Sequence, residues 1–152
     1  MEIGEGKLPQ RLRRLPSRLI NQLALSANRL VDRTLATERA RRYHYALLAS
    51  LEEFGPASQA DLGRRTGIDR SDVVAALNEL AERALVERSP DPSDRRRNIV
   101  SITMPGRQHL DRLDGLLTGA QDELLAPLSP DERRQLIELV TRVVEHRPGT
   151  DG

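Results

Sequence analysis

The sequence predicts a mainly α-helical protein that carries one small β-hairpin. Apolar residues recur at helical spacing through most of its 152 residues. Two short apolar runs flank a polar, proline-containing segment near residue 90, which is the pattern of a hairpin. Cysteine and tryptophan are absent, so disulfides, thiolate metal ligands and thiol redox chemistry are excluded. The length favours one domain over residues 1–152.

The first two helices are expected over residues 17–37 and 41–54. Ser17 is a candidate N-cap for the first, because its hydroxyl can accept from a free backbone N–H. Gly55-Pro56 ends the second, since Gly permits a left-handed residue and Pro cannot continue a helix.

Two short helices joined by a tight turn follow. Ser58 is a good N-cap for the first, which is expected to end at Thr66-Gly67. Asp69 is a candidate N-cap for the second, which is expected to end near Ala84. Two short helices with a Gly-containing turn of this length are typical of a helix-turn-helix.

A hairpin comes next. Residues 85–88 and 98–103 are expected to be strands, and the polar segment 89–97, with two prolines, is expected to be a long loop between them. A helix-turn-helix followed by such a hairpin is a winged helix, and we assign residues 41–103 to it.

Two more helices close the chain. One begins at Thr103, and the other has Ser129 as its N-cap, followed by Pro130 at the first position and Glu132 at the third. Apolar residues cover more than half the circumference of the last helix, which indicates a further packing partner. We expect that partner to be a second copy of the chain, so that residues 8–37 and 104–147 are dimerisation helices. The alternative is that the last helix docks on the first helix of its own chain.

Charge alone does not indicate nucleic-acid binding. The net charge is +1, and basic and acidic residues balance across residues 55–103. The excess of arginine suits phosphate recognition, but codon usage in a GC-rich genome also produces it. No apolar run approaches a membrane span, and the N-terminus lacks a signal-peptide core, so we expect a cytoplasmic protein.

Arginines at particular positions favour binding to duplex DNA. Arginines on a hairpin tip can enter a narrow minor groove, and a helix N-terminus attracts phosphate. The alternatives are a solvated loop at the tip and a mere capping role for Asp72. The candidate DNA-binding residues are Ser58, Gln59, Arg64, Arg65, Arg70, Ser71, Asp72, Asp94, Arg95, Arg96 and Arg97.

A small-molecule site is a second hypothesis. Tyr43, His44 and Tyr45 stand together in a chain that has three aromatic residues, and they could line a pocket for an aromatic acid. The alternative is ordinary packing. His44 and His109 lack the spacing of a metal site, so we expect no metal and no cofactor.

Two other function classes fit less well. No nucleophile elbow, phosphate-cradling glycine loop or metal motif is present, so we do not expect an enzyme. A winged helix that binds only proteins remains the alternative, although it would not need the three consecutive arginines 95–97.

The chain resembles the MarR family of bacterial transcriptional regulators over about residues 20–146. The residues that carry the likeness are segments 58–62, 67–74, 80–88 and 91–97, followed by Ile102-Thr103 and Gly106. The resemblance implies a homodimeric repressor or activator that binds a pseudo-palindromic operator and is released by a small ligand. It also implies that Asp94 orients Arg96, which inserts into the groove.

The chain departs from the family pattern at three places. Ala84 stands where the family often has Gly, and an alanine disfavours a left-handed residue there. Val74 and Ala75 replace the Thr and Arg often found on the recognition helix, so the operator sequence is not carried over. Without cysteine, the family's thiol-oxidation sensing is excluded.

Overall fold

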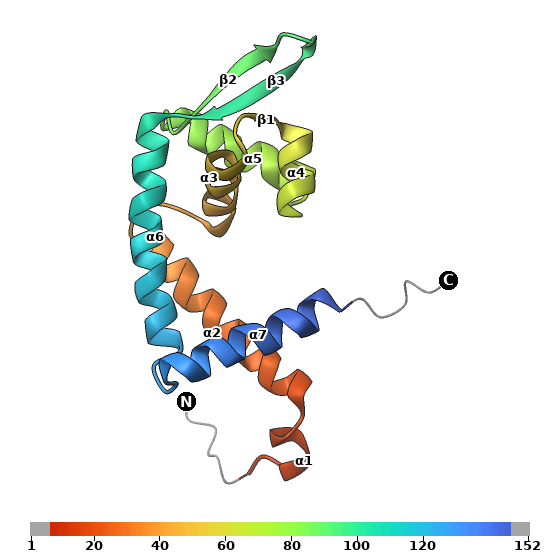
Figure 1. The fold of residues 1–152 in the computed structure, drawn as a ribbon, viewed down its shortest axis with the longest axis vertical. Coiled ribbons are helices and arrows are strands. Elements are labelled where there is room, and N and C mark those ends of the chain that lie inside the picture. The colour runs from red at the N-terminus through yellow and green to blue at the C-terminus, as the bar shows by residue number, and fades with distance from the viewer. Residues whose placement is uncertain (1–6, 147–152) are drawn as a thin grey trace, which may run out of the picture.

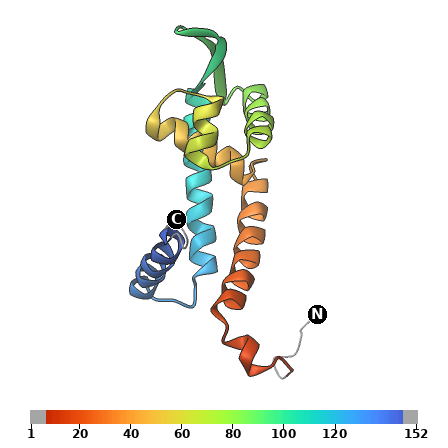
Figure 2. The same ribbon diagram turned by 90° about the vertical axis from the view of Figure 1, so that its right-hand side faces the viewer.

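A computed structural model describes residues 7–146, which form an elongated base and a smaller upper lobe (Figure 1). The base contains α1 (Gln10–Arg13), α2 (Pro16–Ala36), α6 (Met104–Leu124) and α7 (Pro130–Glu145). The upper lobe contains α3 (Arg42–Phe54), β1 (Ala57–Ser58), α4 (Gln59–Thr66), α5 (Arg70–Glu82), β2 (Val86–Asp91) and β3 (Asp94–Ile102). The two long helices α2 and α6 run side by side below this lobe (Figure 2).

Each part has its own apolar core. In the upper lobe, leucines of α3, α4 and α5 pack against Val100 of β3 and are excluded from solvent. A smaller cluster of Leu35, Ala40 and Leu113 joins the end of α2 to α6. Full burial of each leucine side chain is worth roughly 1.5–3 kcal/mol, so the larger cluster is the main source of the lobe's stability.

The hairpin differs from the expected long loop. The strands continue to Asp91 and Asp94, and only Pro92 and Ser93 form the turn. The sheet order β1-β3-β2 places β2 at an edge, where Pro90 is tolerated because its missing N–H faces no further strand. A register irregularity at Pro90/Asp91 accommodates the turn. The strand β1 was not expected from the sequence; its two residues pair with Val100 and Ile99 of β3.

Two expectations about local backbone are wrong. Ser17 is not the N-cap of α2, because Leu15 occupies that position and Pro16 opens the helix. Ala84 adopts a left-handed conformation with φ 57°. Tertiary contacts hold it there, since its carbonyl accepts from Thr103 Oγ1 at 2.7 Å and the adjacent Leu85 carbonyl accepts from Thr103 N at 3.2 Å.

The predicted caps at Ser58 and Ser129 are confirmed, and the helix expected to begin at Thr103 is capped by that residue. Ser58 accepts from the backbone N–H of Asp61, Thr103 accepts from that of Gly106, and Ser129 forms a capping box with Glu132. Gly67 ends α4 with φ 71°, as the Gly-containing turn predicted.

Candidate nucleic-acid interface

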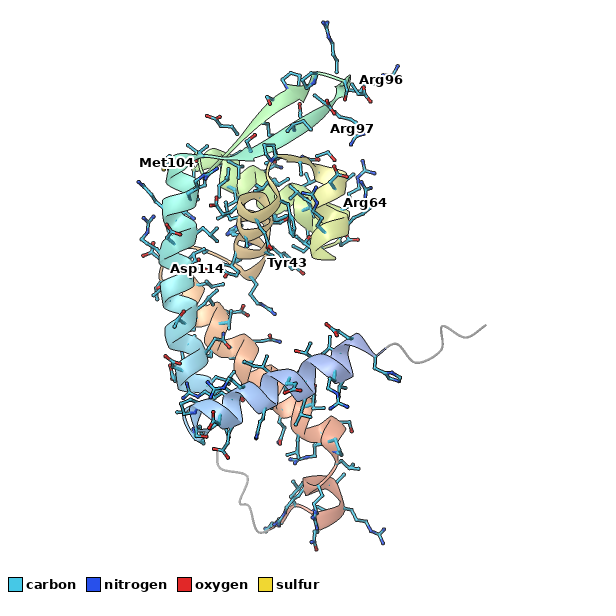
Figure 3. The ribbon with its side chains drawn as sticks, viewed as in Figure 1. Tyr43, Arg64, Arg96, Arg97, Met104 and Asp114 are labelled. Carbon is cyan, nitrogen blue, oxygen red and sulfur yellow. The ribbon has the colours of Figure 1, made fainter. Side chains whose placement is uncertain are left out.

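A basic hollow of about 590 Å³ lies where α4, α5 and the hairpin meet. Its charged lining consists of four arginines and no carboxylate, which favours an anionic partner. Figure 3 shows Arg64, Arg96 and Arg97 on the same side of the upper lobe. The polar and charged residues that line the hollow are Ser58, Gln59, Arg64, Arg70, Arg96, Arg97 and Asn98.

Arg97 fastens the hairpin to the helix-turn-helix. Its Nη2 donates to Ser58 Oγ at 3.1 Å, and the same oxygen accepts from the Asp61 backbone N–H at 3.2 Å. Ser58 is 3% exposed. The hydroxyl of Ser58, one of the candidate DNA-binding residues, thus caps α4 and holds the hairpin against it.

Asp94 shapes the hairpin tip through the backbone. Its Oδ1 accepts from the backbone N–H of Arg96 at 3.0 Å, so the carboxylate sets the turn beside Arg96 and is not bonded to an arginine side chain there. Across the turn, Asp91 accepts from both the backbone N–H and the hydroxyl of Ser93. These bonds lower the pKa of Asp91, and they leave the exposed Arg95 and Arg96 projecting from a structured tip.

The two arginines of α4 have different surroundings. Arg64 lines the hollow and forms an ion pair with Asp61. Arg65 lies outside the lining, with its guanidinium carbon 5.6 Å from the centre of the Phe54 ring. The structure therefore places Gln59 and Arg64, but not Arg65, with the hairpin arginines.

The start of α5 presents Arg70 to the hollow. Ser71 donates its hydroxyl to Asp69 Oδ2 at 2.8 Å, while Asp69 holds the N-cap position without a side-chain cap bond. Asp72 lies in the first turn, where a carboxylate interacts favourably with the positive end of the helix. Arg70 is thus the basic side chain of this turn that is available to a phosphate or base edge.

Three further residues of this region were not among the candidate DNA-binding residues. Asn98 lines the hollow two positions after Arg96, on the same face of β3. Arg88 Nη2 donates to Asn78 Oδ1 at 2.7 Å, which ties β2 to α5. Strand alternation could have indicated Asn98, but the Arg88–Asn78 contact depends on how the hairpin packs.

The residues expected to share a ligand pocket point in different directions. Tyr43 is exposed and lines a hollow of about 350 Å³ with Arg41, Arg42 and Asp32. Tyr45 donates to Asp114 Oδ1 at 2.6 Å, and that bond raises its pKa to about 12. Successive helical residues point about 100° apart, so the three side chains face different surroundings.

The side chain of the buried His44 contacts α5 and does not line the hollow beside Tyr43. It is 3% exposed, and its Nε2 lies 2.7 Å from Glu79 Oε2.

Within residues 7–146, no cluster of three or more His, Asp or Glu side chains is arranged to bind a metal. No helix in the same range is long and apolar enough to cross a membrane.

A tight helix-turn-helix, a short three-stranded sheet and a projecting basic hairpin together define a winged-helix protein. A family model described as the MarR family matches residues 39–97. A transcriptional regulatory protein of Thauera aromatica is 33% identical over 120 residues, which are 78% of this chain and 72% of that relative. The chain therefore belongs to the MarR family of transcriptional regulators. This membership confirms the resemblance, the fold class and the expectation that it is not an enzyme.

Individual relatives agree with this membership. The HTH-type transcriptional repressor NicR of Pseudomonas putida is 31% identical over 101 residues, which are 66% of this chain and 64% of NicR, slightly less than two thirds of that relative. A transcriptional regulator from Pseudomonas aeruginosa is 30% identical, with a TM-score of 0.78 over 88% of this chain and 99% of that structure. PcaV from Streptomyces coelicolor, solved with its natural ligand, is 28% identical with a TM-score of 0.75 over 91% and 97%.

Proposed function

We propose that two copies of this chain bind a pseudo-palindromic operator in duplex DNA and act as a repressor. The observation that carries the proposal is the hollow lined by Arg64, Arg70, Arg96 and Arg97 and by no carboxylate. In this arrangement the start of α5 enters the major groove, and the hairpin tip reaches the adjacent minor groove. NicR is named a repressor, which supports the sign of regulation.

Within the proposed contact, the residues have separate roles. Arg96 and Arg95 enter the minor groove from the tip, where its negative potential is strongest. Gln59, Arg64 and Arg70 contact phosphates or base edges from the two helices. Arg97 holds the hairpin against α4, as its bond to Ser58 indicates.

The exposed apolar faces of the base support a homodimer. No residue of α7 is buried, and Ile137, Val143 and Val144 are 61%, 68% and 73% exposed. On α2, Leu19 and Ile20 are also exposed. Apolar surface of this extent marks an interaction site, and we propose that helices within 8–37 and 104–147 pair with those of a second copy, residue 147 lying outside the described range.

We also propose that a small organic effector binds the hollow beside Tyr43. Arg41, Arg42 and the phenol of Tyr43 line it and suit an aromatic acid. The ligand complex of PcaV supports an effector in a relative of this fold. Because the target is chromosomal DNA, we propose a cytoplasmic location.

Fluorescence anisotropy with duplex fragments from upstream of its own gene tests the DNA proposal. We expect binding that weakens steeply with salt, because phosphates are neutralised, and a footprint with half-sites about 10 base pairs apart. Undetectable binding to every such fragment at low salt would refute it and would favour the protein-binding alternative. A monomeric mass at micromolar concentration would refute the homodimer.

A further inference from the structure

Glu79 lies on α5, two turns after the DNA-facing start of the helix, and both of its carboxylate oxygens are used. Oε1 accepts from Arg41 Nη2 at 2.6 Å, and Oε2 lies 2.7 Å from His44 Nε2. Arg41 and His44 are the N-cap and third residue of α3. The carboxylate therefore joins α5, the recognition helix of the proposed DNA contact, to the beginning of α3.

The hydrogen bonds around His44 define its tautomer. The backbone N–H of Arg41 donates to Nδ1 at 3.1 Å, so this nitrogen carries no proton. Nε2 must then carry the proton and donate it to Glu79. Burial lowers the pKa of His44, although the bond to Glu79 acts in the opposite direction, so the neutral ring is the form present at neutral pH.

A second attachment lies one turn further along the same face of α5. Arg83 donates from Nη1 to the carbonyl of Arg39 at 3.0 Å and from Nη2 to that of Glu38 at 3.3 Å. Arg39 has φ 53°, a left-handed conformation that is costly for a residue with a side chain. Glu79 and the C-cap residue Arg83 are thus bonded to residues 38–44, which join the end of α2 to the first turn of α3.

We infer that Glu79, held by Arg41 and His44, is a positioning residue that sets the direction of the recognition helix relative to α2. The inference rests on the proposed DNA-binding function. Because α2 belongs to the proposed dimer interface, the same contact sets the direction of each recognition helix relative to its partner. Specific readout needs that geometry, whereas non-specific attraction to phosphates does not.

Comparison of Glu79→Ala with Glu82→Ala tests the inference. Glu82 is exposed on the same helix, so the two variants remove the same charge. For each protein, affinity is measured for the footprinted operator and for an unrelated duplex. For Glu79→Ala we expect the ratio of the two affinities to fall at least about fivefold. Its non-specific affinity, salt slope and dimer mass should match those of Glu82→Ala.

Glu79→Gln covers the case in which Glu79→Ala fails to fold, because the amide keeps the size and one acceptor oxygen. Its operator preference should lie between those of the wild type and Glu79→Ala. Operator preference equal to that of Glu82→Ala in every folded Glu79 variant overturns the inference. Failure of the wild-type protein to bind any duplex instead overturns the proposed function, so the two failures are distinguishable.

A pH profile separates positioning from a merely structural role. His44 faces Glu79, Arg41 and Arg83, and a proton on Nδ1 would remove the acceptor for the Arg41 N–H. His109 of α6 lies in the same region, with Arg83, Arg112, Glu38 and His44 around it.

The matching variant is His44→Gln, which can still accept and donate but does not titrate. Because the pKa of His44 lies below its ordinary 6.5, operator preference of the wild type should hold above that pH and fall as the pH drops below it, and His44→Gln should reduce that fall. If operator preference depended on pH identically in the two proteins, His44 would not be the group that positions Glu79.

Discussion

Replacing Gly106 by alanine should lower the free energy of unfolding by about 2 kcal/mol. A Cβ at this position would lie 2.1 Å from the Leu85 carbonyl oxygen and 2.9 Å from Ile102 Cγ1. The oxygen belongs to the backbone between α5 and β2, so α6 and that segment must separate. The separation weakens the bond from Thr103 N to the same oxygen.

The estimate combines three contributions. Overpacking costs about 1–3 kcal/mol, the weakened hydrogen bond costs about 1 kcal/mol, and alanine is favoured over glycine in a helix by about 1 kcal/mol. For a chain of this length the net loss corresponds to a melting temperature lower by about 4–8 °C.

Thermal unfolding followed by circular dichroism measures the effect. Gly115→Ala on the same helix is the matched control, because a Cβ there meets no atom within 4 Å. That variant should unfold at the same temperature as the wild type or slightly higher. An unchanged or raised melting temperature for Gly106→Ala would refute the close approach of α6 to Leu85.

Four further outcomes are expected. Ala84→Gly should raise the melting temperature, because it removes a left-handed strain of about 1–2 kcal/mol at a smaller entropic cost; a lower value would contradict the positive φ. Arg96→Ala should weaken operator binding by about 1–3 kcal/mol without changing the melting temperature, and an unchanged dissociation constant would remove Arg96 from the proposed contact. The pKa values of His44 and His109 lie below the ordinary 6.5, so below that pH the unfolded chain binds more protons than the folded one. Stability should therefore be full above about pH 6.5 and fall as the pH drops from there; urea midpoints that are equal at pH 7.5 and 5.5 would contradict this. Val140→Glu should give a monomer by light scattering if the exposed face of α7 pairs with a second copy, and a persistent dimer would place the interface elsewhere.

The helix boundaries were predicted well because N-caps and C-terminal glycines form hydrogen bonds with residues nearby in the sequence. Ser58 and Ser129 cap the helices they were expected to cap, and Thr103 caps the helix that was expected to begin there. Gly67 adopts the left-handed conformation that the turn requires. Each of these features depends on bonds to atoms at most four residues away, which the sequence displays directly.

The hairpin and the ligand trio show where local reasoning ends. Pro90 and Pro92 suggested a loop. On an edge strand, however, the missing N–H of a proline costs no inter-strand hydrogen bond, and only the sheet order shows that β2 is an edge strand. Tyr43 and Tyr45 are neighbours in sequence, yet helix geometry turns them toward different elements. Ala84 disfavoured a positive φ, but contacts with Thr103 outweigh that local preference.

By itself, the sequence determined the helical class, the helix-turn-helix spacing, the basic hairpin and the absence of thiol chemistry, because periodicity, caps and composition are local properties. Tertiary structure alone decided which of the basic residues share a surface. In the folded chain Arg65 lies outside the hollow, and the bond between Arg97 and Ser58 holds the hairpin against α4. Tertiary structure also brought Glu79 onto His44 across 35 positions of sequence. The physical reason is that such contacts depend on the packing of elements distant along the chain, and no residue pattern within one element specifies that packing.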